Sequence, residues 1–205
     1  MGIDQIAAGR ARCVFLDRDG VLNESIVRNG RPYPPAHLEE FRIYPDVPDG
    51  CARLKDAGFL LIVVTNQPDV GRGTQTRAAA DALNRRLLSA LPMLDRIEVC
   101  FHAGAEQGEP CHCRKPKPGM LLTAAAALKI DLSRSYLIGD RWRDVDCARN
   151  AGCAAVFISR GYAEPLRQTP DFTVTNFAEA TDAILAAEEH RGLLLPRKSR
   201  NSDAS

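Results

Sequence analysis

Long apolar runs are absent from this chain of 205 residues. No stretch reaches the roughly 18 consecutive apolar residues that a membrane-spanning helix needs. The first residues, MGIDQIAAGRARC, also lack the apolar segment of a secretory signal, and Ile6 stands where a myristoylation signal requires Ser or Thr. We therefore expect a cytoplasmic protein that has no membrane partner.

An excess of charge of either sign is also missing. The 27 Lys and Arg residues nearly balance the 26 Asp and Glu residues, which gives a net charge of +1. Proteins that bind nucleic acid present a basic surface, so the composition argues against that class. Internal repeats and the G-x-S-x-G motif of a serine nucleophile are absent too, which disfavours a serine hydrolase. We expect a monomer whose partner is a small molecule.

Seven cysteines are present, and this odd number in a chain without an export signal fits a reducing compartment better than a disulfide framework. Cys13, Cys51, Cys147 and Cys153 stand in apolar segments, and we expect them to be small core residues. The other three cysteines lie close to a histidine, in a pattern that is typical of a metal site.

Apolar segments alternate with helical patterns along the chain. The predicted strands lie at 13–17, 59–66, 96–102, 135–140 and 154–159. The predicted helices lie near 47–57, 75–91, 118–129, 143–151 and 176–189. This alternation predicts an α/β fold, a doubly wound (Rossmann-like) parallel sheet with helices on both faces. We assign 1–190 to a single domain and expect the basic, polar 191–205 to be a disordered tail.

Polar residues follow several of the predicted strands. Asp17 and Asp19 end the first strand, and Asp140 ends the fourth. In parallel sheets, ligands bind beyond the carboxyl ends of the strands. Carboxylates about 4 Å apart repel by roughly 4 kcal/mol at an effective dielectric constant near 20, so three of them need a cation. An oxygen-only ligand set favours Mg²⁺.

The same residues suit phosphoryl transfer. A carboxylate such as Asp17 can attack phosphorus to form an aspartyl-phosphate, and a second acid, Asp19, can protonate the departing oxygen and then activate water. Thr65 and Asn66, at the end of the second strand, offer hydrogen-bond donors for phosphoryl oxygens. Lys115 offers a positive charge for the transition state.

Four segments, FLDRDGVLN, VVTNQ, CRKPKPGM and LIGDRWRD, resemble in order the four motifs of the haloacid dehalogenase-like phosphatases. The resemblance covers about residues 12–160. It implies that Asp17 is the nucleophile and that Asp19 is the acid/base, whose backbone carbonyl also contacts Mg²⁺. Asp140 would be the remaining carboxylate ligand, and Thr65 and Lys115 would hold the phosphoryl group. Asp144 would assist through a metal-bound water, or else serve only as a first-turn acid favoured by the helix dipole.

A second metal site is predicted from Cys100, His102, Cys111 and Cys113, three thiols and one imidazole that form a tetrahedral Zn²⁺ set. His112, between the last two thiols, is a rival ligand. Bound zinc would order the loop 100–113 and bring Arg114 and Lys115 to the site. The C-x-C spacing does not match the C-x-x-C of redox proteins.

A zinc loop ending in CxCRKPxPGM looks like that of the D-glycero-D-manno-heptose 1,7-bisphosphate 7-phosphatases. This resemblance implies a sugar phosphate substrate, most simply the heptose bisphosphate, and no large cap domain. The substrate-binding residues that it implies are Ser25, Arg28, Thr65, Asn66, Gln67, Arg114, Lys115 and Arg141. The chain departs from the pattern at Val21, where Thr is usual, and at Pro68 and Asp69, where Ser-Gly is usual.

Two alternatives remain open from the sequence. One is a histidinol-phosphate phosphatase, a relative that shares the CRKPK segment. The other is a zinc-stabilised binding module in which the phosphatase motifs are vestigial.

Overall fold

A computed structural model describes residues 10–108 and 110–192 of the chain. A six-stranded sheet with the order β5-β4-β1-β6-β7-β8 forms its centre, and every pairing within it is parallel. The strands are β1 (Cys13–Leu16), β4 (Leu60–Asn66), β5 (Arg96–Cys100), β6 (Tyr136–Gly139), β7 (Ala154–Ile158) and β8 (Phe172–Val174). The tail predicted at 191–205 lies outside the described residues, apart from its first two.

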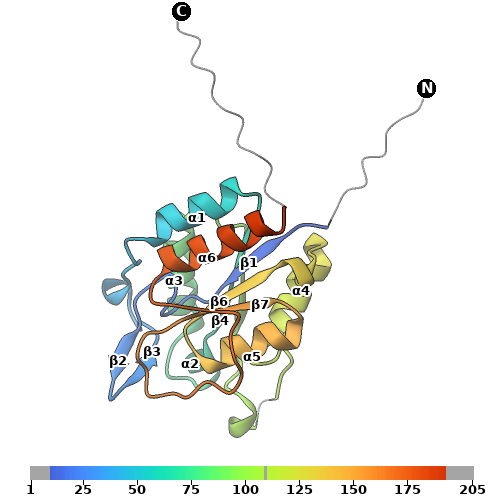
Figure 1. Cartoon of the computed structure of the whole chain (residues 1–205). Helices are drawn as coiled ribbons and strands as arrows, with labels where there is room; N and C mark the ends of the chain where they lie inside the picture. Colours follow the sequence, from blue (N-terminus) through green and yellow to red (C-terminus); the bar gives the residue numbers. More distant parts are fainter. Residues whose placement is uncertain (1–9, 109, 193–205) are drawn as a thin grey trace, which may run out of the picture.

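Helices cover both faces of the sheet (Figure 1). One face carries α1 (Val47–Asp56), α3 (Arg77–Ala90) and α6 (Phe177–His190), and the other carries α4 (Gly119–Leu128) and α5 (Trp142–Ala151). The predicted doubly wound α/β fold is therefore confirmed, and each predicted strand and helix appears at the predicted place within a few residues.

Two hydrophobic cores, one on each side of the sheet, explain why β1 is apolar throughout. Val14 and Leu16 of β1 point into the core under α1, α3 and α6. Cys13 and Phe15, between them in sequence, point into the core under α4 and α5. Because side chains alternate between the faces of a strand, a strand covered on both sides must be apolar at every position.

Small elements were not predicted. Strands β2 (Ile26–Arg28) and β3 (Arg31–Tyr33) form an antiparallel hairpin after β1, and α2 (Pro68–Gly71) follows β4. Three 3₁₀ turns lie at Leu38–Glu40, Ala105–Gln107 and Leu132–Arg134. The hairpin is the insertion after the first strand, which agrees with the expected lack of a large cap in the described part of the chain.

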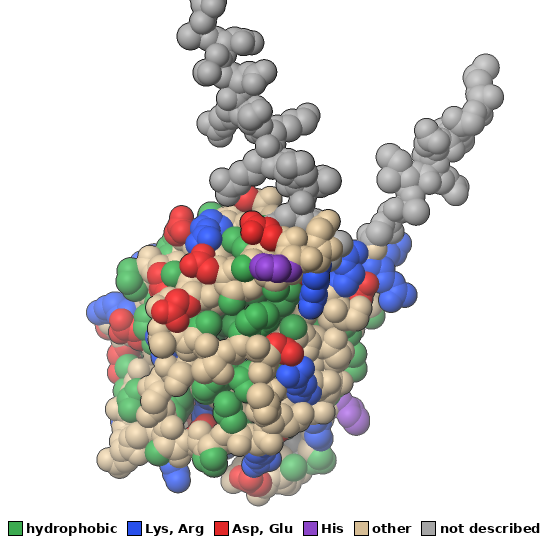
Figure 2. All heavy atoms as spheres, in the orientation of Figure 1, with side chains coloured by type: hydrophobic (Ala, Val, Ile, Leu, Met, Phe, Trp, Pro, Cys, Tyr) green, Lys and Arg blue, Asp and Glu red, His purple; other side chains and the backbone are tan. Residues whose placement is uncertain are grey.

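The exposed surface agrees with the balanced composition. On the face that Figure 2 presents, acidic and basic side chains are interspersed among apolar and uncharged groups. None of the helices within 10–108 and 110–192 is long and apolar enough to cross a membrane.

Candidate active site

The carboxyl ends of three adjacent strands bring the predicted residues together. Strand β1 lies between β4 and β6 in the sheet. Asp17 follows β1, Thr65 lies near the end of β4, and Asp140 follows β6. The backbone N–H of Asp17 still donates to the carbonyl of Ile138, at 2.9 Å. This hydrogen bond continues the β1–β6 ladder and fixes the backbone of Asp17 at the end of β1.

Three buried carboxylates form a cluster at this edge. Asp17, Asp140 and Asp144 each place a carboxylate oxygen within 4.8 Å of the other two. The Nζ atom of Lys115 lies 2.8 Å from Asp17 Oδ1 and 2.7 Å from Asp144 Oδ1. One ammonium therefore faces three carboxylates, and the cluster retains an excess of negative charge that a divalent cation would neutralise.

The pKa shifts reflect this imbalance. Burial raises the pKa of Asp17 to about 6, against the opposing effect of Lys115. Burial, followed by repulsion from Asp17 and then Asp144, raises the pKa of Asp140 well above its usual range. Burial lowers the pKa of Lys115, but Asp144 and Asp17 outweigh it and leave that pKa above its ordinary value. An all-oxygen donor set with unfavourable negative charge fits Mg²⁺.

Two glycines leave room for the cluster. A Cβ atom on Gly139 would lie 2.1 Å from the Cβ atom of Asp144. A Cβ atom on Gly20 would lie 1.7 Å from Asp140 Oδ2, and Gly20 also has a φ of +89°, which L side chains rarely adopt. Both positions, the turn at Gly20 and the end of β6 at Gly139, therefore require glycine for the acids to take their places.

Asp19 is not a member of the carboxylate cluster and is held from several sides. Its carboxylate accepts hydrogen bonds from Arg18 Nε (3.1 Å) and Nη2 (3.0 Å), from Asn23 Nδ2 (3.0 Å) and from Gln67 Nε2 (2.8 Å). The side chain remains 14% exposed and lines the same pocket as Asp17. This fixed position at the rim suits an acid that exchanges a proton with a bound group. Contact between its backbone carbonyl and Mg²⁺ stays a prediction.

Asn66, the last residue of β4, and Gln67, which follows it, orient their neighbours. Gln67 also donates to Thr65 Oγ1 at 2.9 Å and is fully buried. Asn66 Nδ2 donates to the Lys115 carbonyl and the Lys115 N–H donates to Asn66 Oδ1, both at 3.1 Å. Of the two amides predicted to bind substrate, Asn66 lines the pocket, whereas the side-chain amide of Gln67 donates to Thr65 and Asp19. Asn66 thus fixes the backbone that presents Lys115.

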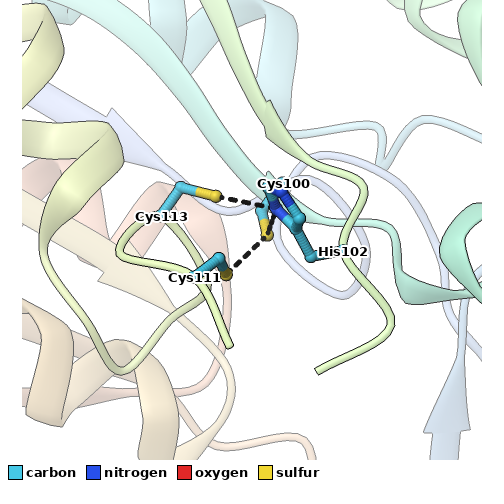
Figure 3. A group of neighbouring side chains, drawn as sticks. All are labelled: Cys100, His102, Cys111 and Cys113. Atoms are coloured by element: carbon cyan, nitrogen blue, oxygen red, sulfur yellow. Dashed lines mark hydrogen bonds between the residues drawn. The ribbon is translucent and has the colours of Figure 1, made fainter. Parts of the chain in front are cut away.

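The predicted zinc ligands converge on one point (Figure 3). Cys100 Sγ lies 3.8 Å from Cys111 Sγ and 3.5 Å from His102 Nδ1, and Cys113 Sγ lies 3.2 Å from the same nitrogen. Tetrahedral zinc with Zn–S of about 2.3 Å and Zn–N of about 2.0 Å separates its ligand atoms by roughly 3.5–3.8 Å. The spacing fits zinc, and His112, the rival ligand, is exposed and outside the cluster.

The pocket beside Asp17 adjoins a larger cleft of about 740 Å³. Asp17, Asp19, Ser25, Thr65, Asn66, Lys115, Arg141 and Arg143 line the pocket, together with the end of β3. Arg114 lines the cleft, along with Arg31, Trp142, Glu164 and Arg167. Arg28 lines neither of the two spaces and instead lies over the Tyr33 ring, 5.8 Å from its centre.

Two residues of this region were missed by the sequence reasoning. Arg143 stands in the GDRWRD segment, in the first turn of α5. Its place next to the predicted site residues Asp140 and Arg141 could have indicated it. Glu164 lies in the loop between β7 and β8 and pairs with both ends of the Arg141 guanidinium, with Nε 2.7 Å from Oε2. Nothing in the sequence around Glu164 indicates this pairing, because it depends on the path of the loop.

A doubly wound sheet with Asp-x-Asp after its first strand and with a lysine and further acids at the same edge defines a hydrolase of the haloacid dehalogenase-like class. The family model described as HAD-hydrolase-like matches residues 112–180. A D-glycero-D-manno-heptose-1,7-bisphosphate 7-phosphatase from Thermosynechococcus vestitus is 33% identical over 190 residues, which are 83% of this chain and 94% of the relative. The corresponding D-glycero-beta-D-manno-heptose enzyme from Yersinia pestis is 36% identical over 185 residues, which are 84% of this chain and 95% of the relative.

Solved structures agree with these relatives. The D,D-heptose 1,7-bisphosphate phosphatase from B. bronchiseptica, complexed with magnesium and phosphate, has a TM-score of 0.71 and 28% identity, and covers 86% of this chain and 99% of its own. A haloacid dehalogenase-like phosphatase from Mesorhizobium loti has a TM-score of 0.69 and 30% identity, and covers 92% and 90%. The chain belongs to the family of the heptose bisphosphate phosphatases, within the haloacid dehalogenase-like phosphatases.

Proposed function

We propose that the protein is a Mg²⁺-dependent phosphatase that removes the 7-phosphate of D-glycero-D-manno-heptose 1,7-bisphosphate through an aspartyl-phosphate on Asp17. The observation that carries this proposal is the buried cluster of Asp17, Asp140 and Asp144 around the Lys115 ammonium. The heptose bisphosphate phosphatases that match most of the chain support the choice of substrate.

Asp17 supplies the nucleophile. Its Oδ1 is held by Lys115 Nζ at 2.8 Å and by the N–H of Arg18 at 2.7 Å, so the carboxylate has one orientation toward the pocket. Lys115 and the hydroxyl of Thr65 lie beside it and would stabilise the negative charge on the transferring phosphoryl oxygens. The carboxylate oxygen forms the new bond to phosphorus while the bond from phosphorus to the sugar oxygen breaks.

Asp19 acts as the general acid and then as the general base. Arg18, Asn23 and Gln67 hold its carboxyl group at the rim of the pocket, where it can give a proton to the departing sugar oxygen. The same group then takes a proton from the water that hydrolyses the aspartyl-phosphate, which restores Asp17 and releases inorganic phosphate.

The metal requirements follow from the two clusters. Asp17, Asp140 and Asp144 would hold Mg²⁺ directly or through water, and the ion would supply charge neutralisation for the incoming phosphate. Cys100, His102, Cys111 and Cys113 would hold a structural zinc. This zinc would order the chain just before Arg114 and Lys115, both of which line the cleft.

Phosphate release tests the proposal. The purified protein is assayed with both anomers of heptose 1,7-bisphosphate, with histidinol phosphate and with simple sugar phosphates, each with Mg²⁺ and with Mg²⁺ withheld. We expect Mg²⁺-dependent preference for a heptose bisphosphate. Preference for histidinol phosphate would assign the chain to the alternative substrate, and release of no phosphate by a folded, metal-loaded protein would favour a binding module.

A further inference from the structure

We propose that Tyr162, in the loop between β7 and β8, is a positioning residue whose hydroxyl orients the carboxylate of Asp140 for Mg²⁺. The hydroxyl holds one oxygen of this carboxylate and leaves the other oxygen to the ion. The inference rests on the proposed function and deepens it, because it takes Asp140 as a ligand of Mg²⁺. Tyr162 stands beyond the last of the four sequence motifs, which ends at Asp144.

The turn at Gly20 brings the two side chains together. A Cβ atom on Gly20 would lie 1.7 Å from Asp140 Oδ2 and 3.1 Å from the Tyr162 hydroxyl oxygen, so both oxygens lie against the same glycine. The hydroxyl interacts with the carboxylate of Asp140 and with the side chain of Ser25. Because a hydroxyl can donate and accept at once, Tyr162 can accept from Ser25 while it donates to Asp140.

Asp140 needs such a donor. The residue is only 2% exposed, and neither of its carboxylate oxygens has a hydrogen bond of ordinary geometry within residues 10–108 and 110–192. Lys115 pairs with Asp17 and Asp144 instead. Buried polar atoms are almost always hydrogen-bonded, and carboxylates that bind metals are held in turn by a second hydrogen bond that sets their orientation. We expect the Tyr162 hydroxyl to complete this bond when Asp140 turns to the ion.

The loop that carries Tyr162 is fixed on both sides of this residue. Two residues before it, Arg160 Nε donates to the carbonyl of Gly20 at 2.9 Å. One residue after it, the N–H of Ala163 donates to the carbonyl of Gly30 at 3.1 Å. The first bond ties the loop to the turn after β1, and the second ties it to the hairpin of β2 and β3. The hydroxyl is therefore presented to the metal cluster from an anchored segment.

Tyr162 lies outside the space that a substrate would enter. It lines neither the pocket beside Asp17 nor the adjoining cleft. With Asp140 it lines a separate, smaller pocket of about 120 Å³. Loss of its hydroxyl should therefore change the binding of the metal and not the contacts of the substrate.

The test measures Mg²⁺ affinity in the absence of substrate. The melting temperature of the zinc-loaded protein is followed against Mg²⁺ concentration, which gives a dissociation constant for each variant. Tyr162→Phe keeps the ring and removes the hydroxyl, and we expect Mg²⁺ to bind about tenfold more weakly, as when other groups that orient metal ligands are removed.

Tyr136→Phe is the matched control. This substitution also removes a hydroxyl that faces a buried carboxylate, that of Glu188 at 2.8 Å. Tyr136 begins β6, whereas Asp140 follows the other end of the same strand. The control should lower the melting temperature and keep the wild-type affinity for Mg²⁺, which separates a positioning effect from a general loss of stability.

Phosphate release gives the second readout. In Tyr162→Phe the Mg²⁺ concentration for half-maximal rate should rise about tenfold, while the rate at saturating Mg²⁺ stays close to that of wild type. Mg²⁺ affinity that depends on Tyr162 in a protein that releases no phosphate would reject the proposed function and support this inference. Unchanged Mg²⁺ affinity in Tyr162→Phe, an equal loss in Tyr136→Phe, a rate that saturating Mg²⁺ does not restore, or a wild-type protein that binds no Mg²⁺ would each overturn the proposal.

Discussion

Replacing Asp17 with Asn should abolish turnover and at the same time stabilise the Mg²⁺-free protein. The reason is the excess negative charge of the cluster, in which Lys115 is the ammonium that faces Asp17, Asp140 and Asp144. Asn has nearly the same shape as Asp, so the change removes the charge and leaves the packing intact.

The magnitude follows from the pKa of Asp17, which rises from 3.8 to about 6 in the folded protein. At about 1.4 kcal/mol per pKa unit, a rise of about 2 units corresponds to roughly 3 kcal/mol. Because the folded state holds the proton more tightly than the unfolded chain, this destabilisation is absent below about pH 4. It grows as the pH rises and is complete above about pH 6.

The assay is urea unfolding across pH 4 to 8 in Mg²⁺-free buffer, with zinc content measured to verify that the second metal stays bound. We expect the free energy of unfolding of wild type to fall relative to that of Asp17→Asn as the pH rises. Added Mg²⁺ should raise the free energy of unfolding of wild type much more than that of the variant. Asp182→Asn, which removes an exposed carboxylate paired with Arg53 at 2.6 Å, is the control and should follow wild type. An Asp17→Asn protein that is less stable than wild type near pH 8 would refute the reasoning.

Three further outcomes are expected. Asn66→Leu loses both hydrogen bonds to the Lys115 backbone and should lower kcat about 30-fold, at about 1 kcal/mol per bond. An unchanged kcat would show that Lys115 is positioned without Asn66. Cys111→Ser should reduce bound zinc from one ion per chain and lower the melting temperature. The same substitution at Cys153, which lies outside the zinc cluster, is the control and should leave the zinc content unchanged. Gly139→Ala should destabilise the protein by about 1–3 kcal/mol and weaken Mg²⁺ binding, because its Cβ would lie 2.1 Å from that of Asp144; wild-type Mg²⁺ affinity would contradict the assigned role of this glycine.

The large elements could be predicted from the sequence because their signals are strong. Strands covered on both sides carry continuous apolar runs, as the first five residues of β4 (Leu60–Asn66) show, and the helices between them have an apolar stripe. The strand β8 (Phe172–Val174) was missed because three partly exposed residues in a polar segment carry no such pattern. The hairpin after β1 had a signal that went unused: Asn29-Gly30, with φ of 51° and 71°, is a typical two-residue hairpin turn.

The residues of the candidate site that stand in sequence motifs could be predicted from the sequence. Asp17 and Asp140 each follow a strand in a recognisable segment, so parallel topology brings them together. Lys115 stands well after β5 (Arg96–Cys100), in a recognisable segment whose place depends on the loop and on its hydrogen bonds to Asn66. Contacts that depend on loop paths could not be predicted. Glu164 is 23 residues from Arg141 in sequence, and the pairing of its carboxylate with that arginine appears only in three dimensions.

The most direct test of the central claim is to trap the covalent intermediate. The protein is mixed with heptose 1,7-bisphosphate and Mg²⁺, quenched during turnover, reduced with borohydride and analysed by peptide mass spectrometry. Reduction of an aspartyl-phosphate converts the residue to homoserine, and the account predicts homoserine at Asp17, dependent on both Mg²⁺ and substrate. Turnover that leaves Asp17 unmodified, or that marks a different residue, would contradict it.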